Sequence, residues 1–213
     1  DALPAQWENR VMTNPPLQFW YEFGSTYTCL SVERIEALAR AASVSLVWKP
    51  FLLMPVLKHL GAGNPFTANA AKCAYMWTDL MRRAAALDLP INRPSLYPPN
   101  SLLTARVALL GMDEGWGVAF TKEAFRQHWL NDLIIGTDEN TGVGLTAAGQ
   151  IPDETLARAL SDTNKEALRH QTQQAIELGL FGSPSFVVDG ELFWGDDRLE
   201  EALKWAVQHR TCS

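Results

Sequence analysis

A strand, a helix and a second strand follow one another near the start of the chain, and this succession limits the fold more than any other feature. Residues 17–23 are short, apolar and rich in aromatic side chains, which is typical of a largely buried strand. From Ser31 onward apolar residues recur at helical spacing, and residues 44–53 alternate again as a strand does. Strands joined through a helix at this separation pair in parallel by a right-handed crossover. We therefore expect a βαβ unit and an α/β fold.

The middle of the chain carries helical patterns instead. Between about residue 55 and residue 182 no segment has a clear strand period, and the expected helices occupy residues 64–87, 100–111, 120–134, 152–162 and 166–179. Pro152 suits a first helical turn. Thr163 and Glu166 form a possible capping box for the last of these helices, which Gly179 would end.

The last part of the chain returns to strands. Two apolar runs flank Asp189-Gly190, which is a strong signal for a hairpin. An amphipathic helix is expected over residues 196–209, with Asp197 and Glu200 as a possible capping box. The predicted organisation has three parts. Residues 1–16 form an N-terminal arm, residues 17–54 and 163–210 together form the core domain, and residues 55–162 form a helical insertion domain.

Composition limits the partners. The net charge at pH 7 is −6 and no basic run occurs, so neither nucleic acid nor an anionic membrane surface is expected. No apolar stretch reaches the ~18 residues of a membrane span, and the first residues lack the pattern of a secretory signal. Cys29, Cys73 and Cys212 are far apart, which predicts reduced thiols in a cytoplasmic compartment. The histidines lack metal-ligand spacing, so no metal site is expected.

Ser25 occupies the junction between the first strand and its helix. In open α/β folds this turn lies at the carboxyl end of the sheet, where ligands bind. The helix start offers unpaired amides and a partial positive charge, and a hydroxyl there can donate a hydrogen bond to a bound thiolate. The alternative is structural, because serine is also a preferred N-cap residue.

Three other stretches allow either a structural or a functional role. Pro184 in "GSPS" predicts an ordinary trans turn, or a cis bond that leaves the Ser183 backbone free to pair with an extended peptide. In "WGDD", residues 194–197, one carboxylate can cap the next helix while the other holds a ligand ammonium, or both are solvated. Lys72 and Tyr75 lie one turn apart and face either one cleft or solvent.

Several stretches together resemble one known family, the 2-hydroxychromene-2-carboxylate isomerases. The stretches are "EFGSTYTCLSVERIEALA", "WKPFLLMPVLKHLG", "NPFTANAAKCAYMWTDL", "RPSLYPPNSLLTAR" and "LFGSPSFVVDGELFWGDDRLEEAL". They occur in unbroken order between about residue 17 and residue 207. The resemblance implies the thioredoxin-like, DsbA-type fold with a large all-helical insertion, which that family shares with the kappa-class glutathione transferases.

The resemblance also implies site residues. Ser25 falls at the position of the family's catalytic serine, and Ser183 precedes a cis proline, Pro184, where its backbone would pair with glutathione. The remaining glutathione-binding and substrate-binding positions are Trp194, Gly195, Asp196, Asp197 and Asn64 for glutathione, and Asn100 and Lys58 for the substrate.

The chain departs from the family pattern at two places. Ser25-Thr26-Tyr27-Thr28-Cys29 stands where the family usually has a proline after the serine, and Cys29 would put a thiol beside the site for the ligand's thiol. Asp196 replaces the usual asparagine, and its negative charge would suit an ammonium group and repel a carboxylate.

The expected function is that of a glutathione-dependent cis-trans isomerase acting on a conjugated aromatic oxo-acid in aromatic catabolism. Bound glutathione would add reversibly as a thiolate stabilised by Ser25, and the resemblance further implies a homodimer. The alternatives are a kappa-like glutathione transferase and a non-catalytic thioredoxin-fold binding protein. A disulfide oxidoreductase is disfavoured, because Thr28 stands where the second redox cysteine is needed.

Overall fold

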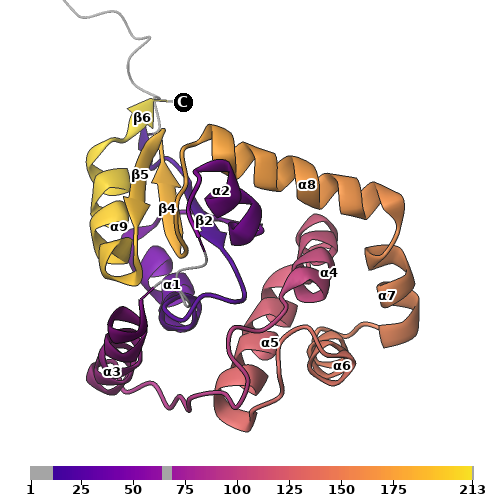
Figure 1. Ribbon diagram of the computed structural model, residues 1–213. Coiled ribbons are helices and arrows are strands. Elements are labelled where there is room, and N and C mark those ends of the chain that lie inside the picture. The colour runs from indigo at the N-terminus through magenta and orange to yellow at the C-terminus, as the bar shows by residue number, and fades with distance from the viewer. Residues whose placement is uncertain (1–11, 64–68, 213) are drawn as a thin grey trace, which may run out of the picture.

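The computed structural model describes residues 12–63 and 69–212, and its centre is a four-stranded mixed sheet (Figure 1). The strands are β2 (Leu17–Tyr21), β3 (Leu46–Pro50), β4 (Ser185–Val188) and β5 (Glu191–Trp194), in the order β3-β2-β4-β5. β2 and β3 are parallel and are connected through α1 (Thr28–Ala42), whereas the other two pairs are antiparallel. The predicted βαβ unit is confirmed, and so is the hairpin, because Asp189 and Gly190 both have positive φ.

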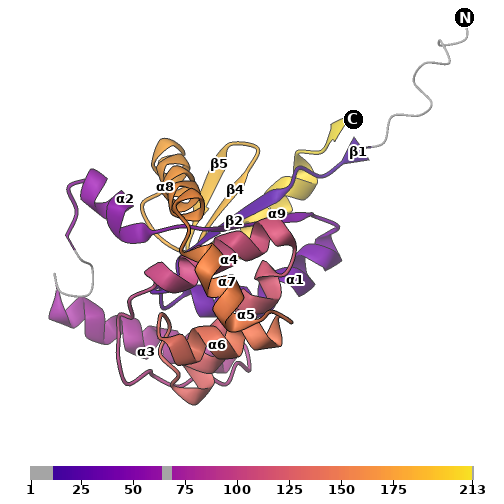
Figure 2. The same ribbon diagram turned by 90° about the vertical axis from the view of Figure 1, so that its right-hand side faces the viewer.

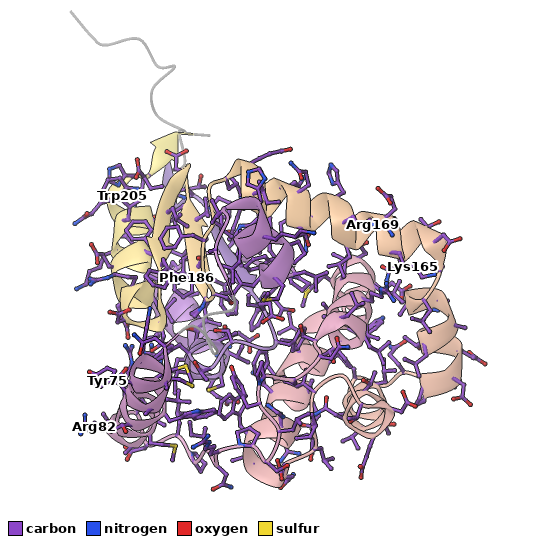
Figure 3. The ribbon with its side chains drawn as sticks, viewed as in Figure 1. Tyr75, Arg82, Lys165, Arg169, Phe186 and Trp205 are labelled. Atoms are coloured by element: carbon purple, nitrogen blue, oxygen red, sulfur yellow. The ribbon has the colours of Figure 1, made fainter. Side chains whose placement is uncertain are left out.

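The two faces of the sheet carry separate apolar clusters, because successive side chains of β2 point to opposite faces. Phe19 belongs to the larger cluster, in which the centroid of its ring lies 4.9 Å from that of Trp48 and 5.6 Å from that of Phe186. α1 and α9 (Leu199–Gln208) cover this face, and Figure 3 labels Phe186 in the sheet and Trp205 on α9. Trp20 points to the other face, where α2 (Leu53–His59) and α8 (Asp162–Glu177) pack over it.

The remaining helices form the block between β3 and α8. They are α3 (Ala70–Ala86), α4 (Leu102–Glu114), α5 (Gly117–Asn131), α6 (Asp138–Ala147) and α7 (Pro152–Ala159). α4 to α7 pack in sequence against one another, while α3 lies apart on the same side as α2 (Figure 2). A buried hydrogen bond of 2.8 Å between the hydroxyls of Tyr21 and Thr121 ties this block to the sheet. In the part of the chain that the structure describes, no helix has the length and apolarity of a membrane span.

Helix α6 was not predicted. Its sequence contains two glycines, which lower helix propensity. Gly144 is needed for packing, since a Cβ there would lie 3.0 Å from the ring of Phe120 on α5. Thr137 caps the helix by accepting a hydrogen bond from the Asn140 amide at 3.2 Å.

Both predicted capping boxes are wrong. α8 begins one turn earlier than expected, and Ser161, not Thr163, accepts the capping hydrogen bond from the Asn164 amide. The final helix starts only after a short 3₁₀ turn, Asp196–Arg198, and no side chain caps it. Pro152 in the first turn of α7 and a positive φ at Gly179 after α8 are confirmed.

Candidate active site

Ser25 lies in the turn between β2 and α1, with 7% of its surface exposed. Tyr27 is the N-cap residue of α1 and no side chain caps this helix, so the capping alternative for Ser25 is wrong. The Ser25 hydroxyl instead donates a 2.6 Å hydrogen bond to the carbonyl of Ser183. The turn at the helix start and the loop before β4 are therefore in direct contact.

Further hydrogen bonds join these two segments. The Ser183 hydroxyl accepts from the Glu22 amide at 2.9 Å and lies 3.0 Å from the hydroxyl of Thr28. The Ser183–Pro184 bond is cis, which decides between the two alternatives that the sequence left open. Ser25, Thr28 and Ser183 thus form a cluster of three hydroxyls at the N-terminus of α1, where the helix dipole favours a negative charge.

A cavity of about 440 Å³, here called the apolar cavity, opens beside Ser25. One wall is the turn itself, with Ser25 and Thr26. Most of the lining is apolar or aromatic, and it comes from α2, α3 and the loop around β4 and β5: Leu53, Leu57, Cys73, Tyr75, Met76, Phe181 and Trp194. Lys72 also lines it, and Figure 3 locates Tyr75 on α3. Lys72 and Tyr75 therefore border one cleft, and both side chains are also exposed to solvent.

A second cavity of about 370 Å³, here called the polar cavity, adjoins the first and shares Tyr27, Ser183 and Trp194 with it. Its other lining residues are largely charged: Asp79, Arg83, Asp196, Asp197 and Arg198. The Tyr27 hydroxyl donates to Asp79 at 2.8 Å, and burial together with this carboxylate raises the pKa of Tyr27. Ser183 thus lies between an apolar space and a polar space.

The position of Trp194, at the start of the loop of residues 194–197, depends on two glycines, Gly195 in the same loop and Gly182 before the cis-proline. Trp194 is 52% exposed and covers Gly182, where a Cβ would lie 2.0 Å from the indole nitrogen. Gly195 has a φ of 108°, which other residues rarely adopt, and its amide donates to the Pro184 carbonyl at 2.9 Å. The two glycines therefore hold the indole of Trp194 against the cis-proline loop.

Asp196 is buried and has three partners. Its carboxylate accepts from the Ser31 hydroxyl at 2.8 Å, from Arg34 at 2.9 Å and from Arg83 at 2.7 Å. The expectation that Asp196 presents an uncompensated negative charge is wrong, because two guanidinium groups neutralise it. Asp197 has a half-exposed carboxylate, 3.8 Å from Arg198, that faces the polar cavity.

Cys29 does not lie beside the ligand site as the sequence suggested. Its thiol donates to the Thr26 carbonyl at 3.0 Å and lines a separate cavity of about 100 Å³ together with Phe125 and Trp129. Burial raises the pKa of this thiol, with the Asp196 charge as a smaller cause. The thiol that lines the apolar cavity is that of Cys73.

Neither of the two substrate-binding positions implied by the resemblance lines the apolar or the polar cavity. Lys58 is exposed on α2 and is not among the residues that line either cavity. The Asn100 carboxamide accepts from the Leu102 amide at 3.2 Å at the start of α4 and likewise lines neither cavity. Asn64, one of the implied glutathione-binding positions, lies outside the described residues.

No sequence pattern predicted roles for Glu22, Tyr97 or Arg83 near the site. Glu22 is buried behind the Ser25 turn, and the Tyr97 hydroxyl donates to the Gly24 carbonyl in the same turn. Arg83 lies 5.6 Å from the Tyr27 ring as well as pairing with Asp196. Their partners lie far away in the chain, so only a model of the tertiary structure could identify these contacts.

The sheet, the cis-proline loop and the hydroxyl cluster at the first helix define a protein of the thioredoxin-like class. The model of the DSBA-like thioredoxin domain matches residues 16–205. The chain belongs to this family.

Similar protein sequences support the resemblance to the isomerases. The 2-hydroxychromene-2-carboxylate isomerase of Sphingobium xenophagum is 27% identical over 188 residues, which cover 86% of this chain and 94% of the relative. Glutathione S-transferase kappa 1 of Caenorhabditis elegans is 24% identical over 199 residues, covering 87% and 88%.

Solved structures show the same fold. A 2-hydroxychromene-2-carboxylate isomerase superposes with a TM-score of 0.81 at 23% identity, over 90% of this chain and 94% of the other. A probable DsbA oxidoreductase from Streptomyces coelicolor has a TM-score of 0.72 at 21% identity, over 95% and 93%. The thioredoxin-like, DsbA-type α/β fold is thereby confirmed.

Proposed function

We propose that the protein is a glutathione-dependent isomerase of a conjugated aromatic oxo-acid, similar to the 2-hydroxychromene-2-carboxylate isomerases. The observation that supports this most is the position of Ser25. Its hydroxyl borders an apolar cavity and contacts the backbone of the cis-proline loop. Relatives named as such isomerases, matched over most of the chain, support the same reaction.

The residues of the site fit glutathione. The Ser183 backbone would pair with the cysteinyl part, and the 194–197 loop would hold the γ-glutamyl end. Of the two carboxylates in that loop, Asp197 is the one available for an ammonium group, because Asp196 is engaged by Arg34 and Arg83. Arg83 lies in the same cavity wall, and its guanidinium, which pairs with Asp196, would offer further hydrogen-bond donors to a ligand carboxylate.

Bound glutathione would supply a thiolate that adds reversibly to the conjugated substrate, so that rotation about the former double bond becomes possible. Ser25 would stabilise this thiolate by turning its hydroxyl from the Ser183 carbonyl toward the sulfur. A hydrogen bond to a charged group contributes about 1.5–3 kcal/mol. The N-terminal amides of α1 add to this through the partial positive charge of the helix start.

The apolar cavity would bind the substrate. Its walls offer the aromatic rings of Tyr75, Phe181 and Trp194 to a planar ring system. Lys72 lies in the same wall and would pair with the substrate carboxylate. We propose Lys72 for this role in place of Lys58, since Lys58 does not line the cavity.

The direct test compares Ser25→Ala with the wild type in the isomerisation of 2-hydroxychromene-2-carboxylate, with and without glutathione. We expect dependence on glutathione and a loss of turnover of about 10- to 100-fold in the variant, from the loss of one charge-assisted hydrogen bond. Ser45→Ala is the matched control, because Ser45 is exposed and precedes β3, at the opposite end of that strand from the site. Unchanged turnover in Ser25→Ala would refute the proposed role.

A kappa-like transferase is the second candidate, favoured by the nematode relative. The two reactions differ in the fate of glutathione, which an isomerase returns and a transferase consumes. A non-catalytic binding protein is the third candidate; it predicts no turnover with the substrate. We further propose a homodimer in the cytoplasm and the division into a thioredoxin-like domain and a helical insertion over residues 55–162. Light scattering of the purified protein tests the dimer.

A further inference from the structure

A buried carboxylate lies directly behind the turn that carries Ser25. Glu22 follows β2 and is 7% exposed, and it is not among the residues that line the apolar or the polar cavity. One carboxylate oxygen accepts from the Gly24 amide at 2.7 Å. The other accepts from the Ser101 hydroxyl. The proposed chemistry leaves this group without a role.

Side chains hold the Gly24 residue from both sides. Its amide donates to Glu22, and its carbonyl accepts from the Tyr97 hydroxyl. A Cβ at Gly24 would lie 2.9 Å from the nearer Glu22 oxygen, so the carboxylate and the glycine are fitted to each other. Because Ser25 is the next residue, the orientation of its backbone follows from these two contacts.

The backbone of Glu22 reaches the other two parts of the site. Its amide donates to the Ser183 hydroxyl at 2.9 Å, and its carbonyl accepts from the Ser25 amide at 3.2 Å. Tyr97 and Ser101 come from the segment before α4, and the Tyr97 ring contacts Trp77 of α3 at 4.9 Å. Glu22 therefore connects the Ser25 turn, the cis-proline loop and the helical block.

We propose that Glu22 is the positioning residue of Ser25, and that its carboxyl group, as the acceptor of the Gly24 amide, holds the Gly24 peptide in the orientation in which the Ser25 hydroxyl serves the site. This inference rests on the proposed function only for the role of Ser25 itself. The hydrogen-bond network is a property of the protein without ligand.

The ionisation of this carboxylate falls in the neutral range. Burial raises the pKa of Glu22 to about 7, against the opposing effect of the Ser101 and Gly24 hydrogen bonds. The titratable group facing it from the segment before α4 is the Tyr97 phenol, whose pKa is raised by burial and by the Glu22 charge. From α1, the buried Cys29 thiol couples to Tyr97.

Protonation changes one contact and keeps the other. The Gly24 amide needs an acceptor in either state, so the proton has to sit on the oxygen that faces Ser101. The Glu22–Ser101 hydrogen bond then reverses, with Glu22 as the donor. The contact to the helical block therefore changes at the pH at which the carboxylate titrates.

The amide resonance of Gly24 reports this titration without any ligand. In protein with nitrogen-labelled glycine, we expect the Gly24 signal to shift with pH, with a midpoint near 7. Glu22→Gln keeps an acceptor for the amide and should abolish the shift, whereas Glu33→Gln, a change at an exposed residue of α1 whose carboxyl pKa is also raised, should leave it. Ser101→Ala should raise the midpoint, since its hydrogen bond lowers the pKa of Glu22. A Gly24 signal that does not titrate near neutral pH, or that still titrates in Glu22→Gln, would overturn the inference.

Calorimetry with glutathione at about pH 8 tests whether Glu22 acts through Ser25. Glu22→Leu removes the acceptor of the Gly24 amide, so it should weaken binding about 3-fold or more in the wild-type background, and less than about 2-fold in the Ser25→Ala background. Equal weakening in both backgrounds, or tighter binding in Glu22→Leu, would contradict positioning. If the wild type binds no glutathione at millimolar concentration, the proposed function fails, and the Gly24 titration alone decides the role of Glu22.

Discussion

Replacing Glu22 with glutamine should change how the stability of the protein depends on pH. The pKa of Glu22 is raised from 4.5 to about 7, mainly by burial. Between these two values the folded protein binds more protons at this site than the unfolded chain does. The neutral carboxyl therefore contributes stability that is fully present below pH 4.5 and is lost as the pH rises through about 7. Each pKa unit corresponds to about 1.4 kcal/mol, so the free energy of unfolding should fall by about 2–3 kcal/mol between pH 5 and pH 8 from this group.

Urea denaturation followed by tryptophan fluorescence, at about pH 5 and about pH 8, measures this difference. Other carboxylates titrate equally in both proteins, so the wild type should lose about 2–3 kcal/mol more than Glu22→Gln over this interval. Glu191→Gln is the control, because Glu191 is exposed, and it should follow the wild type. The same pH dependence in Glu22→Gln and in the wild type would show that the carboxyl is not held in a site that disfavours its charge.

Three further changes test the two cavities. Asp196→Asn leaves Arg34 and Arg83 without their counter-charge, so it should lower the free energy of unfolding by about 1–3 kcal/mol in urea denaturation. The same change at half-exposed Asp197 is the control and should lower it by less than about 0.5 kcal/mol. Equal effects of the two changes would refute the buried network. Lys72→Met should raise KM for 2-hydroxychromene-2-carboxylate about 5-fold or more with little change in kcat. Lys58→Met is the control and should leave KM unchanged. If Lys58→Met raises KM and Lys72→Met does not, Lys58 binds the substrate instead. Gly182→Ala places a methyl group 2.0 Å from the Trp194 indole nitrogen, so the indole has to move. We expect glutathione binding, measured by calorimetry, to be at least about 10-fold weaker. Unchanged affinity would mean that the indole is not part of the wall of the ligand site.

Local patterns were enough to find the elements that carry the site. The strand–helix junction at Ser25 and the hairpin at Asp189-Gly190 follow from short stretches with known periods and turn residues. The local pattern left the isomer of Pro184 open, and only the family resemblance implied the cis bond that the structure has. Helical spacing places Lys72 and Tyr75 on one face of a helix, but it leaves open whether that face borders a cleft or solvent. These features are local, and local features are what a single sequence expresses.

The contacts that position the site could not be predicted. Glu22 meets Ser101, 79 residues further along, and Gly24 meets Tyr97 at a separation of 73. Cys29 was misplaced because it is near Ser25 in sequence, whereas in the structure its thiol enters the core. Asp196 was interpreted as a free charge because its two arginines lie on α1 and α3, far away in the chain. Such long-range pairs leave no periodic trace in the sequence.

The measurement that tests the central claim most directly is the pKa of the glutathione thiol in its complex with the protein, followed by the ultraviolet absorbance of the thiolate. The hydroxyl of Ser25 should hold this pKa well below that of free glutathione, and Ser25→Ala should raise it by about 1–2 units, which is the loss of one hydrogen bond to a charged sulfur. A bound thiol that titrates identically in the wild type and in Ser25→Ala would contradict the account.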